Sequence, residues 1–297
     1  MGIVLGDNRY GKAETHVVRV VRDTTRHEIR DLVVSTALRG DFTAAHDAGD
    51  QAMVLPTDTQ KNTVLAYAKE VGVSSPEAFA TALARHFVDH VGPVTSARVT
   101  VDEDVWDRAD VDGAPHDHTF VRRGTDVRTV AVTAGAGTTH VVSGLRDLVL
   151  LKSTGSEFRG FLTDSYTTLQ PTTDRVMATS LTARWRWREV PADPDAAWSA
   201  VRALLVSRFG GLHSLALQQT LWEMGRAVLA ADDAVGEVRL SAPNRHHFAA
   251  DLGPFGLANP GEVFWAADRP YGLIEVEVRR DDEEPPPAAW ADLPGFV

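Results

Sequence analysis

The residues best suited to bind a small molecule lie between Leu148 and Arg175. This stretch begins as a short apolar run, which is typical of a buried strand, and continues as a Lys-Ser-Thr-Gly-Ser loop. It also contains three aromatic residues, Phe158, Phe161 and Tyr166. An aromatic ring offers a stacking surface and a guanidinium offers two parallel donors, so together they could hold a flat, anionic molecule. A core loop with an ordinary surface arginine explains the same residues, and residue chemistry alone favours it.

Two positions nearer the N-terminus could assist such a site. Thr57 and Asp58 lie where a predicted helix begins, and free backbone N–H groups and the helix dipole favour negative charge there. A plain N-cap is the simpler interpretation and requires no catalysis. Lys12 precedes the first predicted strand. A lysine accepts a proton readily only where burial lowers its pKa, and a surface lysine is the default.

The second half of the chain offers an amide and a histidine. Gln218 lies in the first turns of a predicted helix, where its amide could read the edge of a heterocycle or simply face water. His246, in the sequence Pro-Asn-Arg-His-His, could transfer a proton or be an ordinary loop histidine. His116 and His118 would share one face of a strand, as metal ligands can, but no third ligand is near in sequence, so we predict no metal site.

Composition narrows the class of protein. The chain has 297 residues, no cysteine and a formal net charge of −11. Such a chain lacks the clustered basic residues of a general nucleic-acid binder, and it has no disulfide, thiolate nucleophile or cysteine-bound zinc. No secretory signal and no membrane-spanning run is visible, so we expect a cytoplasmic protein without membrane partners. Phosphate-binding and dinucleotide-binding motifs are missing, so no nucleotide or flavin cofactor is indicated.

Hydrophobic periodicity predicts the same order of elements in both halves of the chain. The first half shows strands at 17–21, 31–38, 97–101 and 120–132, with helices at 60–71 and after a capping box at 74–77. Asp58 or Thr59 is the expected cap of the earlier helix. The second half shows strands at 140–152, 181–188, 237–241 and 273–278, with helices beginning at Pro194 and Ser214.

These elements predict an α+β fold made of two ββααββ units, each an antiparallel sheet with two helices on one face. We place the units at residues 10–137 and 138–280, because a Gly-rich seam at 134–137 separates them. Residues 281–297 begin with a charged, proline-rich stretch, which is typical of a mobile tail.

The stretch from Leu148 to Arg175 resembles the signature of the urate oxidase (uricase) family. Its matching positions, at the family's spacing, are Lys152, Ser153, Thr154, Phe158, Phe161, Tyr166, Leu169 and Arg175. Shorter matches occur in the family's order at 10–12, 57–58, 61–63, 113–118, 218 and 244–246. The resemblance covers nearly all of the chain from Tyr10 to about Arg280.

The resemblance implies a fold and an assembly. Uricases have the tunnelling fold, with two tandem ββααββ units in each chain. Dimers close a β-barrel tunnel with helices outside, and two barrels stack into a homotetramer. The active sites are shared between subunits, so Lys12, Thr57 and Asp58 would come from the neighbouring chain.

The resemblance also implies a reaction: urate is oxidised by O2 and water to 5-hydroxyisourate and H2O2, with no metal and no organic cofactor. The implied catalytic residues are Lys12, Thr57 and His246, which would relay protons. The implied substrate-binding residues are Thr57, Asp58, Phe158, Leu169, Arg175, Leu217, Gln218 and Asn244.

The implied roles differ from residue to residue. Phe158 would stack on the purine, Arg175 would hold a carbonyl and a ring nitrogen, and Gln218 would bind the opposite edge. Leu217 would donate its backbone N–H, and Leu169 would shape the pocket. The roles of two further residues concern oxygen and the loop: Asn244 would hold O2 and then water, and Asp58 would anchor the loop beside Thr57. Arg245 is a departure, because many family members carry lysine there.

Two alternatives remain open from the sequence. Another purine or pterin enzyme of the tunnelling fold, such as an aldolase or cyclohydrolase, would share the pocket, although zinc-dependent cyclohydrolases depend on cysteine. A purine-binding relative without turnover would keep the pocket alone, but the matches at Lys12, Thr57 and His246 argue against it.

Overall fold

The computed structural model describes residues 2–267, 269–284, 286–291 and 293. The chain divides into two compact units. Unit 1 comprises the described residues within 1–144, 186–195 and 284–292, and unit 2 those within 145–185, 196–283 and 293. The predicted boundary between residues 137 and 138 falls in the turn between strands β6 and β7.

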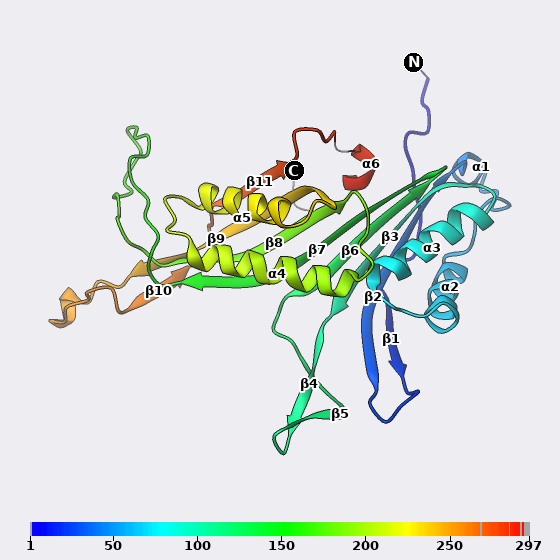
Figure 1. Ribbon diagram of the computed structural model, residues 1–297. Coiled ribbons are helices and arrows are strands. Elements are labelled where there is room, and N and C mark those ends of the chain that lie inside the picture. Colours follow the sequence, from blue (N-terminus) through cyan, green and yellow to red (C-terminus); the bar gives the residue numbers. More distant parts are fainter. Residues whose placement is uncertain (1, 268, 285, 292, 294–297) are drawn as a thin grey trace. The chain divides into compact units, whose positions relative to one another are not determined.

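Unit 1 contains an antiparallel sheet with helices packed against it (Figure 1). Its strands pair in the order β1-β2-β3-β6, followed by the first part of β7, and α3 packs on β3 and β6. The hairpin β4–β5 forms a separate two-stranded sheet. The elements are β1 (Thr15–Val21), β2 (Glu28–Gly40), α1 (Thr43–Asp47), α2 (Thr57–Glu70), α3 (Pro76–His90), β3 (Val94–Asp104), β4 (Trp106–Val111), β5 (Ala114–Arg122), β6 (Val127–Gly135), β7 (Thr138–Lys152) and α6 (Pro287–Trp290).

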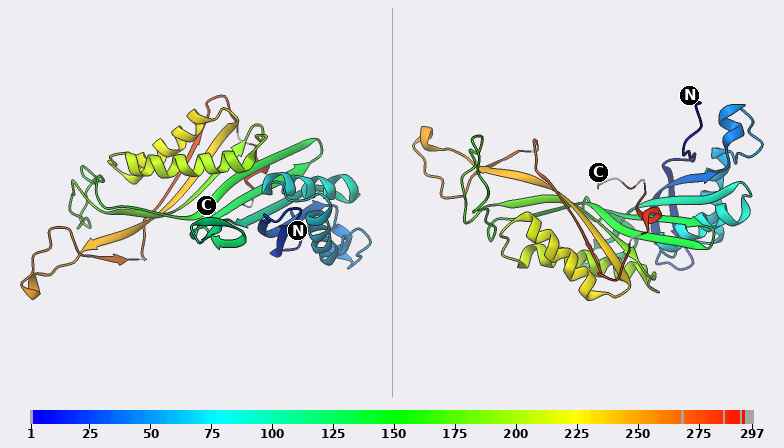
Figure 2. Two further views of the ribbon diagram at one scale, coloured as in Figure 1. Left: turned by 60° about the horizontal axis from the view of Figure 1, so that its bottom comes forward. Right: turned by 90° about the horizontal axis from the view of Figure 1, so that it is seen from above.

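Unit 2 repeats the pattern of a sheet covered by two helices. The remainder of β7 is followed in the sheet by β8, β9 and β10, and β11 pairs with the first half of β9. Figure 2 shows α4 and α5 side by side on one face of this sheet. The elements are β8 (Met177–Trp187), α4 (Pro194–Gly211), α5 (Leu217–Ala231), β9 (Val235–Ala249), the 3-10 turn η1 (Gly253–Phe255), β10 (Phe264–Ala267) and β11 (Leu273–Arg279).

Local sequence explains the main elements. The side chains that alternate along β8 at Leu181, Ala183 and Trp185 are fully buried, as a half-buried strand requires. On α3, the residues spaced by four, Phe79, Leu83 and Phe87, are fully buried beneath the helix. The α+β class with antiparallel sheets is confirmed. The ββααββ order holds in both units once hairpin β4–β5, strand β10 and the short helices α1, η1 and α6 are set aside.

Several predicted boundaries were wrong. Helix α2 begins at Thr57 after an N-cap at Pro56, so neither Asp58 nor Thr59 is its cap. The Asp58 carboxylate instead binds Lys61 and Asn62 of the same helix, at 2.5 and 3.1 Å. Helix α5 begins at Leu217 rather than at Ser214, whose hydroxyl lies in the turn before the helix.

The predicted strand 120–132 is two strands. β5 ends at Arg122 and pairs with β4, whereas β6 begins at Val127 and pairs with β3. Gly124 has a positive φ of 52°, which interrupts an extended chain. Four further elements were not predicted: α1, β4, η1 and β10.

The predicted tail at 281–297 contains α6. Ala289 and Trp290 of this helix are buried, and the carbonyl groups of Ala288 and Ala289 accept hydrogen bonds from Arg98 of β3. Residues 285, 292 and 294–297 lie outside the described residues, and the mobility of the tail stays a prediction.

A buried cluster of charges supports unit 1. The Arg128 guanidinium, which is 3% exposed, contacts Glu77 at 2.6 Å, Asp195 at 2.6 Å and Glu103 at 3.3 Å. Arg30 contacts Glu103 at 2.8 Å and also pairs with Asp195. Burial opposes ionisation of Asp195, but the hydrogen bonds and charges of Arg30 and Arg128 outweigh it and lower its pKa.

We predict that Asp195→Asn destabilises the chain at neutral pH and not in acid. A carboxylate whose folded pKa is depressed stabilises the folded state above its unfolded pKa, about 3.9, and this contribution is lost as pH falls through the folded pKa. Thermal unfolding across pH should therefore show a lower midpoint for Asp195→Asn near pH 7 and a shrinking difference below about pH 4. Asp112→Asn, at an exposed turn of positive φ, is the control without an effect. A difference that grows in acid would contradict this assignment.

Candidate active site

The loop between β7 and β8 holds an arginine against an aromatic ring. The guanidinium carbon of Arg175 lies 5.2 Å from the centre of the Phe158 ring. Phe161 stacks on Phe158 with ring centres 5.0 Å apart and planes inclined by 14°. The sequence analysis predicted that these residues would act together, and unit 2 brings Phe158 and Arg175 into contact.

Three sets of hydrogen bonds fix the base of this loop. The backbones of Phe158 and Thr172 exchange two hydrogen bonds of 2.9 Å, which join the two sides of the loop. The Asp174 carboxylate accepts from the Thr154 hydroxyl at 2.7 Å and from the Gly155 N–H at 3.0 Å. Arg175, the next residue, donates from Nε to the Ser156 hydroxyl at 3.4 Å. The loop ends are therefore held while its middle part is free to contact a ligand.

Among the described residues, no carboxylate neutralises the charge of Arg175. Its side chain is partly buried, and burial lowers its pKa. Within the described residues, no carboxylate lies at ion-pair distance from its guanidinium. A partly desolvated cation lying on an aromatic ring is a suitable receptor for a planar anion.

The start of α5 is tied to the same loop. Ser156 and Ser214 form a parallel β-bridge, in which the Glu157 N–H donates to the Ser214 carbonyl at 2.8 Å. Leu217 and Gln218 are the first two residues of α5, whose opening N–H groups have no acceptor within the helix. Leu217 is buried, whereas the Gln218 side chain is exposed.

Strand β9 places two further predicted residues on one face. Asn244 and His246 are two positions apart, so both side chains leave the same side of the strand. Asn244 lies after the segment paired with β11, and its N–H donates to the Gly272 carbonyl at 2.7 Å. The His246 ring stacks on Phe248, 5.6 Å away.

The remaining predicted residue of the loop, Leu169, is exposed to 56%. Leu162 and Tyr166 in the same loop are more exposed still. Large apolar side chains in this position do not belong to the core of unit 2, and they are available to another surface or to a ligand.

Unit 1 contains the other group of predicted residues. The backbone of Lys12 is held by Thr36. The Lys12 N–H donates to the Thr36 hydroxyl at 3.2 Å, and the Thr36 N–H donates to the Lys12 carbonyl at 2.8 Å. The Thr36 hydroxyl donates in turn to the buried amide oxygen of Gln60 at 2.6 Å. Gln60 belongs to the first turn of α2, which also carries Thr57 and Asp58 on its exposed side. Lys12 is partly buried.

The positive charge of Lys12 affects the first turn of α2. The Asp58 carboxylate has a lowered pKa, chiefly because of its hydrogen bond with Lys61, and Lys12 adds a smaller effect of the same sign. Lys12, Thr57 and Asp58 thus form one group in unit 1. The predicted residues of unit 2, from Phe158 to His246, form the other group.

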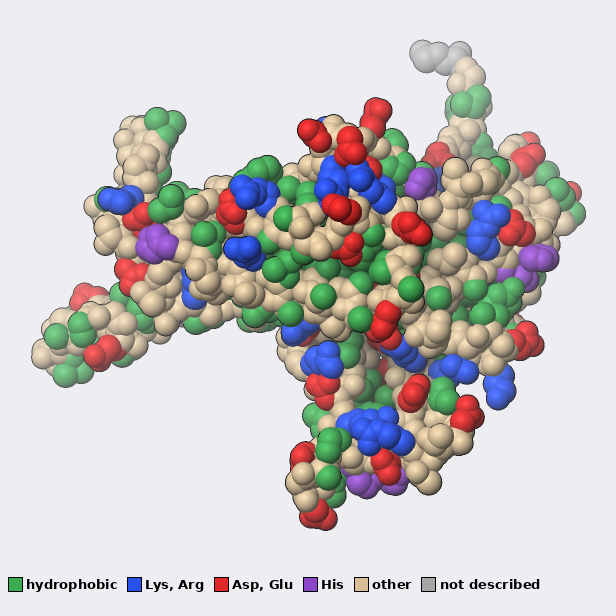
Figure 3. Space-filling view, viewed as in Figure 1, with side chains coloured by type: hydrophobic (Ala, Val, Ile, Leu, Met, Phe, Trp, Pro, Cys, Tyr) green, Lys and Arg blue, Asp and Glu red, His purple; other side chains and the backbone are tan. Residues whose placement is uncertain are grey.

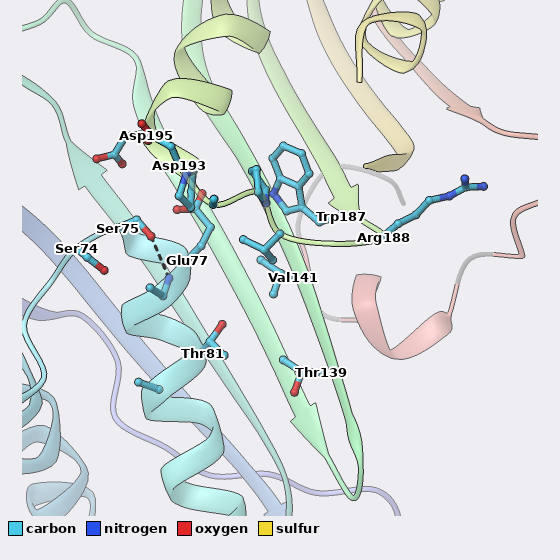
Figure 4. A pocket seen from close by; sticks show the side chains of 16 residues that line it. Ser74, Ser75, Glu77, Thr81, Thr139, Val141, Trp187, Arg188, Asp193 and Asp195 are labelled. Carbon is cyan, nitrogen blue, oxygen red and sulfur yellow. Dashed lines mark hydrogen bonds between the residues drawn. The ribbon is translucent and has the colours of Figure 1, made fainter. Parts of the chain in front are cut away.

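A hollow of about 810 Å³ lies in unit 1 beside the start of α3 and contains no predicted site residue. Figure 4 shows Trp187 and Val141 beside it, with Glu77, Asp193 and Asp195 at its upper end. The Glu77 carboxylate is occupied by Arg128 and by the Ser143 hydroxyl, at 2.6 and 2.7 Å. This hollow is separate from both groups of predicted site residues.

The described residues also lack a metal site, a membrane-spanning helix and a continuous basic patch on the face in Figure 3. They contain no group of three or more His, Asp or Glu side chains arranged to hold a metal; the His116 and His118 rings pack on each other at 4.4 Å. No helix among them is long and apolar enough to span a membrane. On the face shown in Figure 3, Lys and Arg side chains alternate with Asp and Glu and form no continuous basic patch.

The sequence analysis missed the polar residues that hold the loop, notably Ser156, Asp174 and Ser214. Ser156 and Asp174 had a signal, as hydroxyl and carboxyl residues at the two ends of the aromatic stretch, whereas Ser214 lies outside it. We interpreted Ser214 as a helix start, because serine is common there.

Comparisons with known proteins agree with this architecture. The sequence pattern of the family described as Uricase matches residues 8–133 and 141–275. The uricase of Arthrobacter globiformis is 50% identical over 99% of this chain and 96% of its own length, and that of Aspergillus flavus is 35% identical over 92% and 95%. The crystal structure of the Arthrobacter globiformis uricase superposes with a TM-score of 0.94, covering 98% of this chain and 100% of that one. A Bacillus sp. TB-90 urate oxidase mutant, 20% identical, shares the fold with a TM-score of 0.82, covering 92% of this chain and 99% of that one.

These matches define an α+β protein of the tunnelling fold. The chain belongs to the uricase family. Its activity is that of a urate oxidase, an oxidoreductase that uses O2 and water to convert urate to 5-hydroxyisourate and H2O2.

Proposed function

We propose that this chain binds urate with Phe158 and Arg175 and oxidises it with the help of Lys12, Thr57 and His246. The observation that supports the proposal best concerns the Arg175 guanidinium. It is partly buried on the Phe158 ring, and no carboxylate of the described residues forms an ion pair with it. A flat anion would stack on the ring and supply the missing negative charge.

Substrate binding follows from the groups around this pair. Urate would lie on Phe158 with a carbonyl and a ring nitrogen on the two parallel N–H groups of Arg175. The side-chain amide of Gln218 and the backbone N–H of Leu217, in the first turn of α5, would bind the opposite edge. Leu169 would close the pocket with its exposed side chain.

Proton transfer is the task of the second group. Urate is oxidised easily once it has lost two protons, so the site must accept a proton and stabilise the resulting dianion. The hydroxyl of Thr57 would pass this proton between the substrate and Lys12, and His246 would complete the relay. Asp58 would hold the turn that carries Thr57, through its contacts with Lys61 and Asn62.

Oxidation then balances without an added redox group. O2 takes two electrons from the urate dianion and two protons and leaves as H2O2, while a water adds at C5 and gives the hydroxyl of 5-hydroxyisourate. Asn244 would hold O2 and afterwards the water above the ring. We propose that neither a metal nor an organic cofactor takes part.

We further propose that each site joins unit 2 of one chain to Lys12, Thr57 and Asp58 of a neighbour in a homotetramer. Two properties support this. Strand β1 is an edge strand with one partner, and its Val18 and Val20 side chains are exposed. Leu162, Tyr166 and Leu169 are exposed in the loop that carries Phe158.

Arg175→Lys tests the binding role. Lysine keeps the charge but loses the two parallel donors, so we expect the KM for urate to rise by about tenfold or more. Initial rates of urate loss, followed by absorbance at several urate concentrations, measure the change. Arg159→Lys is the matched control in the same loop, because Arg159 is exposed and pairs with Glu157 instead. An unchanged KM in Arg175→Lys would refute the assignment.

Thr57→Ala tests the proton relay. Removal of the hydroxyl should lower kcat by roughly a hundredfold, the usual scale for a proton-transfer group, while binding of xanthine, which lacks the C8 oxygen, changes little. Thr57→Ser should recover most of kcat. Thr59→Ala, two residues further along α2 and also exposed, provides the control. If Thr57→Ala weakens xanthine binding and leaves kcat intact, Thr57 only positions the ligand.

A further inference from the structure

A pair of buried hydroxyl groups lies beneath the start of α5. The Ser214 and Thr220 oxygens are 2.7 Å apart, and both residues are fully buried. Neither hydroxyl faces solvent, and neither belongs to the residues proposed to touch urate. Burying two hydroxyls is costly unless both are hydrogen-bonded, so their arrangement requires a reason.

The two hydroxyls share one backbone acceptor. The Ala216 carbonyl lies 3.1 Å from the Ser214 hydroxyl and 3.2 Å from the Thr220 hydroxyl. One hydroxyl hydrogen serves the bond between the two oxygens. The other can be donated to the Ala216 carbonyl or, if it belongs to Ser214, to the Met177 sulfur 3.6 Å away. Ala216 is the N-cap of α5, so this carbonyl sets the direction of the first turn.

The same pair is joined to the loop that carries Phe158. The Ser214 N–H donates to the Gly155 carbonyl at 2.9 Å, and the Ser214 carbonyl accepts from the Glu157 N–H at 2.8 Å. Ser214 therefore has its backbone fixed to the loop and its hydroxyl fixed to the helix. Phe158 follows Glu157, and Leu217 follows Ala216.

We infer that Thr220 is a positioning residue for urate, which acts with Ser214 to fix the spacing between the Phe158 ring and the donors at the start of α5. This inference rests on the proposed function, because it assumes that Phe158, Leu217 and Gln218 bind opposite parts of one ligand. A hydrogen bond spans a narrow range of distances. Small shifts of the first turn of α5 would therefore weaken the proposed hydrogen bonds of Leu217 and Gln218 to urate.

Two substitutions at Thr220 separate the hydroxyl from the packing. Thr220→Val keeps the shape and removes the hydroxyl, which also deprives the buried Ser214 hydroxyl of its shortest hydrogen bond. Thr220→Ser keeps the hydroxyl and removes a methyl group. We expect Thr220→Val to raise the KM for urate and the Kd for xanthine by about fivefold to tenfold, with kcat per folded site within about twofold. Thr220→Ser should stay within about twofold of the wild-type chain in all three.

Control variants distinguish a loss of substrate positioning from a loss of folded protein. Thr179→Val removes another buried hydroxyl of unit 2, one without a hydrogen-bond partner among the described residues, and should leave KM unchanged. A merely structural role would reduce the amount of folded enzyme, and hence apparent kcat, without changing KM. Ser214→Ala offers a second route to the same result should Thr220→Val not fold.

The inference is overturned if Thr220→Val and Ser214→Ala keep the wild-type KM, or if Thr220→Ser raises KM as much as Thr220→Val. Arg175→Lys, measured alongside, distinguishes the positioning role of Thr220 from the binding role of Arg175. If Arg175→Lys raises KM and Thr220→Val does not, only the positioning role of Thr220 is wrong. If Arg175→Lys leaves KM unchanged, the proposed binding of urate by Phe158 and Arg175 is wrong.

Discussion

A positive charge that is partly removed from water and forms no ion pair is an expensive arrangement, and Arg175 has it among the described residues. Unit 2 sustains this arrangement through the loop around it. Asp174 closes the loop base, Ser156 accepts from Nε, and Phe158 lies beneath the guanidinium. In the proposed complex, a planar anion would recover this electrostatic cost on binding, and the same constraint would favour a flat ligand.

The fold was largely predictable, because both periodicities are strong. Leu181, Ala183 and Trp185 on β8 alternate into the core, and α5 buries Leu221 and Met224 on one stripe. The failures occurred where short-range signals were ambiguous. The chain at 120–132 reads as one strand until the turn at Gly124 divides it, and α1 is too short for its periodicity to show.

The candidate site was less accessible to residue chemistry than the fold. Phe158 and Arg175 could be proposed as a pair from their types, but an ordinary core loop explained them as well. Their assignment came from a resemblance across the whole stretch, which the family comparisons support. Ser214 and Thr220 could not be predicted, since nothing in a serine or threonine indicates that its hydroxyl will be buried against another. Lys12 and Thr57 lie in unit 1, and their proposed role would depend on a neighbouring chain, which the sequence of one chain does not display.

The central claim is that each site takes its binding half and its relay half from different chains. Co-expression of Thr57→Ala and Arg175→Ala chains carrying different affinity tags, followed by two-step purification, isolates oligomers that contain both. In random mixtures, about a quarter of the sites would combine an intact relay half with an intact binding half, so the mixed oligomer should regain about that share of wild-type turnover. Mixed oligomers no more active than the two parents would contradict the account.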